Sequence, residues 1–405
     1  MRISFKLPSN LKSGALVTAA LFGCLTNFVI AGDKANSRLA PEATAAEAKL
    51  EFRDISRLER AFIDTAPAKR KDKIQVGKLS ADGRETDSIV KLAKEIADKK
   101  HGKYDSLLIA HKDKLIFESY YLRGRINLPH PQASAVKAYT SLAVGRAIQL
   151  GYLSMADLNK PLVSFLKDLD PTKFTDGAEK ITLHKALTMH GGLSVNREEW
   201  EALEKETPEV LKGQGLVQTL LEKSKPITAE SQTYMYGNYN PMLVMTVIDA
   251  VVPGTARDFI KNEILDKLNI SNYSWDTHIS GLPQAGWMVS LTSRDMLKLG
   301  SVVLNNGQWN GEQLVSSEYL AKATSGLVKP TEDWMPQSYR YGYFWYQAPL
   351  AVGNENYNAT FAWGGGGQRV IVIAELDLTI VITAHDREDK IMTQIENAVL
   401  PVFAK

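Results

Sequence analysis

The segment Ser134-Ala-Val-Lys137 places a hydroxyl and an amine one helical turn apart, at the start of a long apolar run. A serine hydroxyl is a poor nucleophile at neutral pH unless a neighbouring base accepts its proton, and a lysine with a lowered pKa can be that base. The spacing alone is weak evidence, because the Ser-x-x-Lys pattern also occurs at Ser9/Lys12, Ser88/Lys91 and Ser164/Lys167.

The residues after Ser134 distinguish it from the other three copies. They are apolar on nearly every side until Gly151, a typical helix stop, so we expect a helix inside the protein. Burial and the positive helix N-terminus both disfavour a charged Lys137, and the spacing puts its side chain on the same helix face as Ser134. The helix start also offers the Ser134 N–H to a developing oxyanion. The alternative is that Ser134 caps the helix while Lys137 reaches water.

Tyr236-Gly-Asn238 is the second motif, and it is the only Tyr-x-Asn in a chain with fifteen tyrosines. It falls in a predicted loop before the apolar run 242–252. A tyrosine beside a lysine ammonium can ionise readily and relay a proton. The alternative is a turn tyrosine that anchors the start of a helix.

Trp363-Gly-Gly-Gly-Gly-Gln368 is the third motif and opens a predicted strand. Glycines at this point let a substrate approach the backbone closely and supply a second amide for an oxyanion hole. A phosphate-binding loop is excluded, because no Lys-Ser or Lys-Thr follows and the next element is a strand.

The order of these motifs resembles that of the serine beta-lactamase and penicillin-binding protein superfamily. The resemblance runs from about Ser106 to the C-terminus and includes GRAIQLGYLSMADLNKPL, LHKALTMHGGL and LNNGQWNGEQLVS. It implies an α/β (α+β) fold of the beta-lactamase/transpeptidase type. In that fold an antiparallel sheet is flanked by helices and carries an all-helical subdomain.

The resemblance also implies a role for each motif residue. Ser134 would be the acylated nucleophile and Lys137 its proton partner. Tyr236 would protonate the leaving group, and Asn238 would orient Lys137 or the substrate amide. The oxyanion would be held by the backbone N–H groups of Ser134 and Gly366.

The chain departs from better-known members at the triplet Trp363-Gly364-Gly365, where they have Lys-Thr-Gly. The missing cation and hydroxyl help those proteins to hold a substrate carboxylate. The triplet looks like the Trp-Gly-Gly of certain family VIII esterases, and the run ending at Gln368 is similar to amidases that cleave aminohexanoate oligomers. Arg340 or Arg369 could replace the lost cation.

We therefore expect a serine hydrolase that acts on a small ester, amide or peptide-like molecule, with no metal or organic cofactor. One alternative is a beta-lactamase or D-alanyl-D-alanine carboxypeptidase. Another is a catalytically silent binding module. The aromatic cluster Tyr339 to Tyr346 stays outside the predicted site, because strand alternation explains it adequately.

The N-terminal 31 residues have the pattern of a secretory signal peptide. Arg2, Lys6 and Lys12 precede an uncharged stretch that ends at Ala31, after which we expect cleavage. The protein should then be periplasmic or secreted, without stable membrane insertion. Lipid attachment at Cys24 fits less well, because the bulky Phe22 precedes the small residue Gly23.

The mature chain is predicted to have two parts. Residues 32–85 are polar and should form a partly helical extension, and residues 86–405 should form the hydrolase domain. Within it, residues of about 134–290 would make the helical subdomain, and 86–133 with 291–405 the sheet.

Two strand-like hairpins supply the predicted sheet. Residues 106–110 and 114–121 flank one polar turn, and residues 369–374 and 378–383 flank the other.

The composition excludes several other functions. A formal charge of +2 without a basic block argues against nucleic-acid binding. The single cysteine, Cys24, lies in the predicted signal peptide, so the mature chain would have none. This excludes thiol catalysis and cysteine-ligated metals in the mature chain. The seven histidines are scattered, with no His-Glu-x-x-His motif for zinc.

Overall fold

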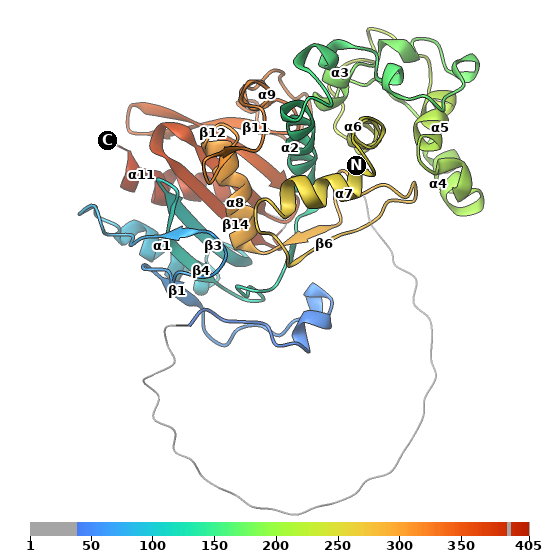
Figure 1. Cartoon of the computed structure of the whole chain (residues 1–405). Helices are drawn as coiled ribbons and strands as arrows, with labels where there is room; N and C mark the ends of the chain where they lie inside the picture. The colour runs from blue at the N-terminus through green and yellow to red at the C-terminus, as the bar shows by residue number, and fades with distance from the viewer. Residues whose placement is uncertain (1–38, 387–389, 405) are drawn as a thin grey trace, which may run out of the picture. The chain divides into compact units, whose positions relative to one another are not determined.

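A computed structural model describes residues 39–386 and 390–404. The predicted signal peptide, its cleavage point and Cys24 lie outside these ranges. From Ala40 onward the chain forms one compact unit (Figure 1). Within the described ranges, no helix is long and apolar enough to cross a bilayer.

A nine-stranded sheet forms the base of this unit, in the order β1-β4-β3-β14-β13-β12-β11-β10, with β2 also beside β4. Only the β2–β4 pairing in this sheet is parallel. The strands are β1 (Phe62–Asp64), β2 (Gln75–Val76), β3 (Tyr104–His111), β4 (Lys114–Tyr120), β10 (Arg340–Tyr341), β11 (Tyr346–Val352), β12 (Glu355–Gly364), β13 (Gln368–Ile373) and β14 (Leu378–Ala384).

Both predicted hairpins are present, as β3–β4 and β13–β14. They meet at the centre of the sheet, where Leu108 on β3 lies opposite Val381 on β14. Every residue of β3, β13 and β14 is buried. Their nearly continuous apolar runs are what strands covered on both faces require.

Helix α2 (Val136–Gln149) is the interior helix that the sequence predicts, and every residue from Val136 to Ala147 is buried. It contacts β12 as well as two other α-helices. The other α-helices are α1 (Asp87–Ala97), α3 (Leu183–Leu187), α4 (Arg197–Glu206), α5 (Gly215–Lys223), α6 (Tyr239–Val251), α7 (Ala256–Ile260), α8 (Ser293–Leu304), α9 (Ser317–Ala323), α10 (Ile391–Gln394) and α11 (Leu400–Phe403).

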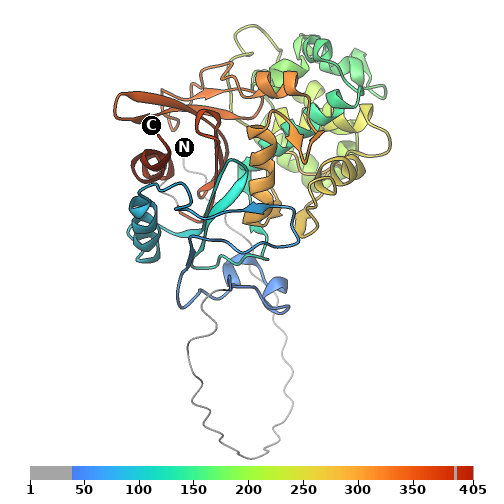
Figure 2. The same cartoon turned by 60° about the vertical axis from the view of Figure 1, so that its left-hand side comes forward.

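The helices cover both faces of the sheet. Figure 2 shows α1 and the C-terminal helices on one face, and α8 on the other. Thr292 starts α8 as its N-cap, because its side chain accepts a hydrogen bond from the Asp295 N–H. A small sheet of β5 (His130–Pro131), β7 (Val289–Leu291) and β6 (Tyr273–Trp275) leads into the start of α2.

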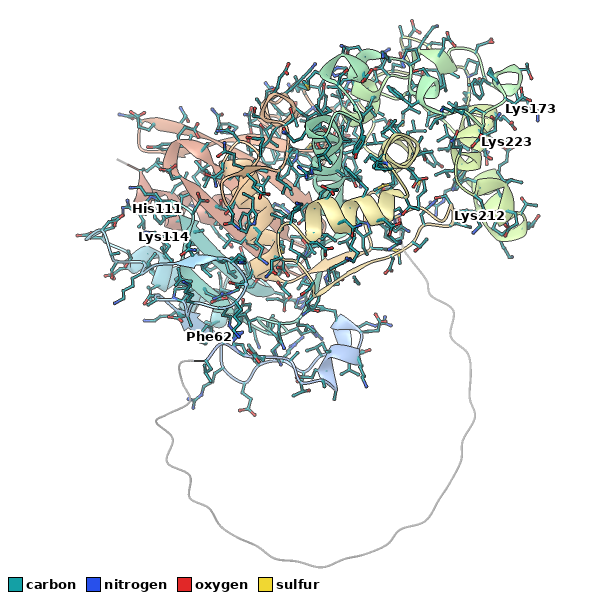
Figure 3. The ribbon with its side chains drawn as sticks, viewed as in Figure 1. Phe62, His111, Lys114, Lys173, Lys212 and Lys223 are labelled. Carbon is teal, nitrogen blue, oxygen red and sulfur yellow. The ribbon has the colours of Figure 1, made fainter. Side chains whose placement is uncertain are left out.

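Residues 40–85 contribute more strand than their sequence suggests. β1 and β2 join the large sheet, whereas helix is limited to short 3₁₀ turns at Glu47–Lys49 and Phe52–Asp54. Phe62, which is labelled in Figure 3, stacks on Tyr120 of the neighbouring strand at 6.3 Å between ring centroids. Strands of two or three residues are too short to produce a visible alternation, so the sequence pattern did not indicate them.

A buried ion pair ties this segment to the sheet and to α8. Arg294 donates to both carboxylate oxygens of Glu118, from Nε at 2.8 Å and from Nη2 at 2.7 Å. Its Nη1 donates to Asp72 at 2.7 Å. Because all these charges are wholly or largely shielded from water, each depends on its partners.

Replacing Glu118 with Gln should lower the free energy of unfolding by about 3 kcal/mol, because it leaves Arg294 without its main buried counter-charge. Urea unfolding followed by circular dichroism measures this change. The exposed Glu355→Gln is the control and should change the free energy by less than about 0.5 kcal/mol. Equal effects of the two substitutions would contradict the structural importance of this ion pair.

Candidate active site

Ser134 and Lys137 lie together at the start of α2. Ser134 is the centre of a 3₁₀ turn, Ala133–Ala135, and Lys137 is the second residue of the α-helix. The lysine Nζ lies 3.2 Å from Ser134 Oγ and donates to the Gly286 carbonyl at 3.3 Å. Lys137 is only 2% exposed, so its amine does not reach bulk water.

The surroundings of Lys137 change its acidity. Burial lowers the pKa of its amine, and the nearby Tyr236 opposes that shift only in part. A lowered pKa makes the neutral amine more available, and only the neutral amine can accept a proton. Lys137 is therefore suited to take the proton of Ser134.

Tyr236 and Asn238 occupy the turn that leads into α6. The Lys137 Nζ lies 4.9 Å from the centroid of the Tyr236 ring. The backbone N–H of Tyr236 donates to Glu332 at 2.9 Å, which fixes this turn to a later loop. Asn238 is the exposed N-cap of α6.

Gly286 explains how Asn238 and Lys137 come close to each other. A Cβ on Gly286 would lie 3.1 Å from Asn238 Oδ1 and 3.2 Å from Lys137 Nζ. A side chain at position 286 would therefore crowd both groups, whereas glycine leaves the Lys137 amine free to reach the Gly286 carbonyl. Gly286 is not among the predicted site residues, because nothing in its local sequence distinguishes it from the other glycines.

The glycines after Trp363 bring the end of β12 against the turn that carries Ser134. A Cβ on Gly364 would lie 2.1 Å from the Gln132 carbonyl oxygen, so only glycine permits this approach. A Cβ on Gly365 would meet no atom within 4 Å, which leaves open space beside its backbone. Gly366 has φ of 88°, a conformation that favours glycine.

A cavity of about 260 Å³ opens beside these groups. Five predicted site residues line it, whereas Lys137, Asn238 and Gly364 do not. The lining residues are Ser134, Tyr236, Trp334, Tyr346, Trp363, Gly365, Gly366 and Asp386.

Aromatic rings form most of the cavity wall. Trp334 makes edge contacts with both Tyr236 and Trp363, at 5.6 Å and 5.4 Å between centroids. Tyr346 contacts Trp363 at 5.2 Å. Burial and the neighbouring Tyr236 raise the pKa of Tyr346, so its phenol stays protonated.

Three of the cavity residues were missed in the sequence. Tyr346 was left in a cluster that strand alternation explained, and Trp334 and Asp386 belong to no motif. Their proximity depends on loop paths and strand pairing, which a linear pattern does not contain. Only the aromatic composition of the region around residue 340 hinted at such a wall.

Neither arginine suggested as a substitute cation lines this cavity. Arg369 is buried, with its guanidinium 4.3 Å from the Trp363 ring centroid and its Nη1 donating to the Gly364 carbonyl. Arg340 donates to the Tyr339 carbonyl at 2.9 Å and holds its own loop. Of the described residues that line the cavity, none is basic.

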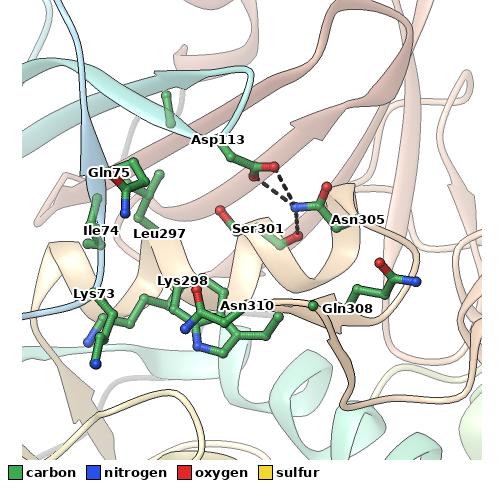
Figure 4. Close-up of a pocket in the computed structure, with 13 residues that line it drawn as sticks. Lys73, Ile74, Gln75, Asp113, Leu297, Lys298, Ser301, Asn305, Gln308 and Asn310 are labelled. Atoms are coloured by element: carbon green, nitrogen blue, oxygen red, sulfur yellow. Dashed lines mark hydrogen bonds between the residues drawn. The ribbon is translucent and has the colours of Figure 1, made fainter.

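A second cavity, of about 280 Å³, lies near β2 and α8 and contains none of the predicted site residues. Asn305 there donates to both oxygens of Asp113, at 2.8 Å each (Figure 4). Ser301 and Lys298 both line it, but the Lys298 amine donates to Asp295 and to the Asn269 carbonyl. Among the described residues, no group of three or more His, Cys, Asp or Glu could hold a metal ion.

Comparison with known proteins identifies the family. Residues 90–397 match the family model described as Beta-lactamase. The chain belongs to the beta-lactamase family. No curated protein sequence matched it.

Solved structures support the same fold for this beta-lactamase-family chain. A protein assigned as a 6-aminohexanoate-dimer hydrolase from Bacillus anthracis is 19% identical, with a TM-score of 0.57 over 76% of this chain and 80% of that one. The hydrolase EstCE1 is 14% identical, with a TM-score of 0.60 over 78% and 99%. A class C beta-lactamase variant is 15% identical, with a TM-score of 0.57 over 77% and 95%. The predicted superfamily and fold class are confirmed.

Replacing Lys137 with Met should abolish activity yet raise the free energy of unfolding at pH 7 by roughly 1 kcal/mol. In the wild type the pKa of Lys137 is lower when folded than when unfolded, so the unfolded chain binds more protons at intermediate pH. The free energy of unfolding of the wild type should therefore rise with pH up to about 10.4, the usual lysine pKa. Lys137→Met should weaken that rise. Urea unfolding at pH 7 and pH 9 measures both effects.

Lys298→Met provides a matched control for this prediction. Lys298 is equally buried, but its amine donates to Asp295 at 2.7 Å and to the Asn269 carbonyl at 2.9 Å. Its loss should destabilise the fold, because Asp295 stays buried without its cation. If Lys137→Met were as destabilising as Lys298→Met and kept its activity, Lys137 would be a structural residue.

Proposed function

We propose that this protein is a serine hydrolase that cleaves an ester or amide through an acyl-enzyme on Ser134. The observation that carries the proposal is the 3.2 Å contact between Ser134 Oγ and the shielded Lys137 amine, beside a cavity that also contains Tyr236. Membership of the beta-lactamase family supports it.

In the acylation step, Lys137 takes the proton of Ser134 while Oγ attacks the substrate carbonyl carbon. The carbonyl oxygen becomes an oxyanion, which the N–H groups of Ser134 and Gly366 stabilise. When the bond to the leaving group breaks, Tyr236 gives that group its proton and regains one from Lys137. The net result is that the Ser134 proton moves to the released alcohol or amine.

In the deacylation step, water attacks the acyl carbon and loses a proton to the same Lys137–Tyr236 pair. The acid leaves, and Ser134 Oγ takes up the proton. Asn238 orients Lys137 or the substrate amide. Its Oδ1 and the Lys137 Nζ both lie next to Gly286, where the missing side chain leaves space.

The cavity wall favours substrates with a flat apolar group. Trp334, Tyr346 and Trp363 offer ring faces and edges, and no described lining residue is basic. A neutral ester or amide fits such a wall better than a substrate that needs a cation for its carboxylate. We propose that the reaction takes place in the periplasm or outside the cell, since the residues up to Ala31 have a signal-peptide pattern.

A beta-lactamase or D-alanyl-D-alanine carboxypeptidase remains the second candidate, because residues 90–397 match the beta-lactamase family model. A fluorescent penicillin separates the candidates. Stable labelling favours the peptidase and rapid release favours the lactamase. No labelling favours the esterase or amidase.

Ser134→Ala should reduce turnover of a chromogenic short-chain ester at least about 10³-fold, because no other group can form the acyl-enzyme. Stopped assays and labelling with a fluorophosphonate probe measure activity and site occupancy. Ser164→Ala is the matched control, since Ser164 has the same spacing to a lysine but donates to the Pro161 carbonyl at 2.6 Å. Undiminished activity of Ser134→Ala would rule the mechanism out. Folded wild-type protein without Ser134 labelling would favour a silent binding module.

Trp334→Ala should raise KM about tenfold for an ester with an aromatic leaving group, and less than about twofold for its methyl counterpart, because one ring contact is lost. Trp334 is 53% exposed, so its removal should not unfold the protein. Trp287→Ala is the control, since Trp287 is 45% exposed but does not line the cavity. Equal changes for both substrates would contradict an aromatic subsite.

A further inference from the structure

Asp105 is a buried carboxylate that the proposed reaction does not use. It lies on β3 and is fully shielded from solvent. Its Oδ2 lies 3.1 Å from His130 Nε2 and 2.7 Å from His385 Nδ1. Its Oδ1 accepts the Arg123 backbone N–H at 2.9 Å. Asp105 therefore links the stretch from Arg123 to His130 with His385, which is 280 residues away from Asp105 in the sequence.

The partners of the two imidazoles indicate which nitrogens carry hydrogen. His385 Nε2 faces Arg123 Nη1 at 3.3 Å, and a guanidinium can only donate, so Nδ1 is the nitrogen that donates to Asp105. His130 faces Asp105 with its Nε2, and its Nδ1 lies 3.0 Å from the Pro131 carbonyl oxygen.

The charge of Asp105 matches these donors. Burial would raise the pKa of Asp105, but the hydrogen bonds from His130 and His385 outweigh it and hold that pKa below its ordinary value. An ionised carboxylate can accept from both imidazoles and from the Arg123 amide at the same time.

The His130 side of this cluster leads directly to the predicted nucleophile. Gln132 Nε2 donates to the His130 carbonyl at 2.8 Å, and the Gln132 N–H donates to the Val289 carbonyl at 2.8 Å. The Tyr139 hydroxyl donates to Gln132 Oε1 at 2.8 Å. These bonds fix the chain immediately before Ser134 and so determine where the Ser134 N–H points.

The His385 side leads to the other predicted oxyanion donor. The next residue, Asp386, donates its N–H to the Gly366 carbonyl at 3.0 Å. Gln368 Nε2 donates to the Gly365 carbonyl at 3.3 Å and to the Ala384 carbonyl at 2.7 Å. The peptide groups on both sides of Gly366 are thus held by the segment that His385 anchors.

We propose that Asp105 is a positioning residue that aligns the two halves of the oxyanion hole through His130 and His385. The inference rests on the proposed function, since it concerns the same Ser134 reaction. Misplacing one such amide by about 1 Å can cost roughly 10²-fold in rate. Asp105 does not line the cavity that contains Ser134, so its effect on the reaction acts through the two histidines and the Arg123 N–H that it binds.

A pair of substrates can distinguish this role from simple support of the fold. An ester and its thionoester differ only at the atom that becomes the oxyanion, and sulfur accepts hydrogen bonds poorly. The rate ratio of ester to thionoester therefore reports how well the oxyanion hole is aligned. A lower fraction of folded enzyme changes both rates equally and leaves the ratio unchanged.

Asp105→Asn keeps the size of the side chain, but its NH₂ group cannot accept from a histidine or an amide. We expect kcat/KM per labelled Ser134 to fall roughly 10–100-fold for the ester and less than about threefold for the thionoester. The ratio should therefore drop by about tenfold or more. Most of the loss should appear in kcat, because ground-state binding needs no oxyanion hole.

Three further variants keep the experiment decisive. His130→Gln retains a donor near Nε2 and should keep most of the wild-type ratio, whereas His130→Leu should lower it as Asp105→Asn does. If Asp105→Asn fails to fold, the two His130 variants test whether the Asp105 cluster aligns the oxyanion hole. Glu118→Gln removes a different buried carboxylate and should lower stability without changing the ratio.

Two results would overturn the inference. If Asp105→Asn and His130→Leu kept the wild-type ratio, Asp105 would support only the fold, and the proposed function would stand. If the wild type showed no turnover that depends on Ser134, both proposals would fail together.

Discussion

The amine of Lys137 is the group on which the candidate site depends. Enclosing it in the protein lowers its pKa and so disfavours its charged form, and the proposed reaction needs the neutral amine to accept the Ser134 proton. The enclosure needs several distant parts of the chain: the interior helix α2, the turn before α6 and the backbone at Gly286. Such burial destabilises the fold locally, so the large sheet and its helices must supply the compensating stability.

The glycines after Trp363 allow the end of β12 to approach the turn that carries Ser134. Two backbones approach so closely at Gly364 and Gln132 that no side chain would fit, and this approach brings Gly366 to the cavity that contains Ser134. Where better-known superfamily members carry a cation and a hydroxyl, this chain has a tryptophan and glycine. The cavity consequently has an aromatic wall, with the guanidinium of Arg369 stacked on Trp363 rather than lining the space.

The centre of the sheet connects these two halves. β3 comes from the first third of the chain and β14 from its end, and their pairing places Asp105 beside His385 (Figure 1). The same carboxylate bonds to His130, four residues before Ser134. The sheet thus connects, through Asp105, the two segments that carry the proposed oxyanion donors Ser134 and Gly366.

The sequence alone determined the local features. The continuous apolar run after Ser134 predicted a buried helix, the hairpins followed from their apolar runs and polar turns, and the order of motifs indicated the family. These features depend on neighbours within about one turn of helix or one strand, so a linear pattern can show them. Gly286, Trp334, Tyr346 and the Asp105 cluster could not be found in this way. Their contacts join residues far apart in the chain, and only the tertiary structure brings them within hydrogen-bonding or ring-contact distance.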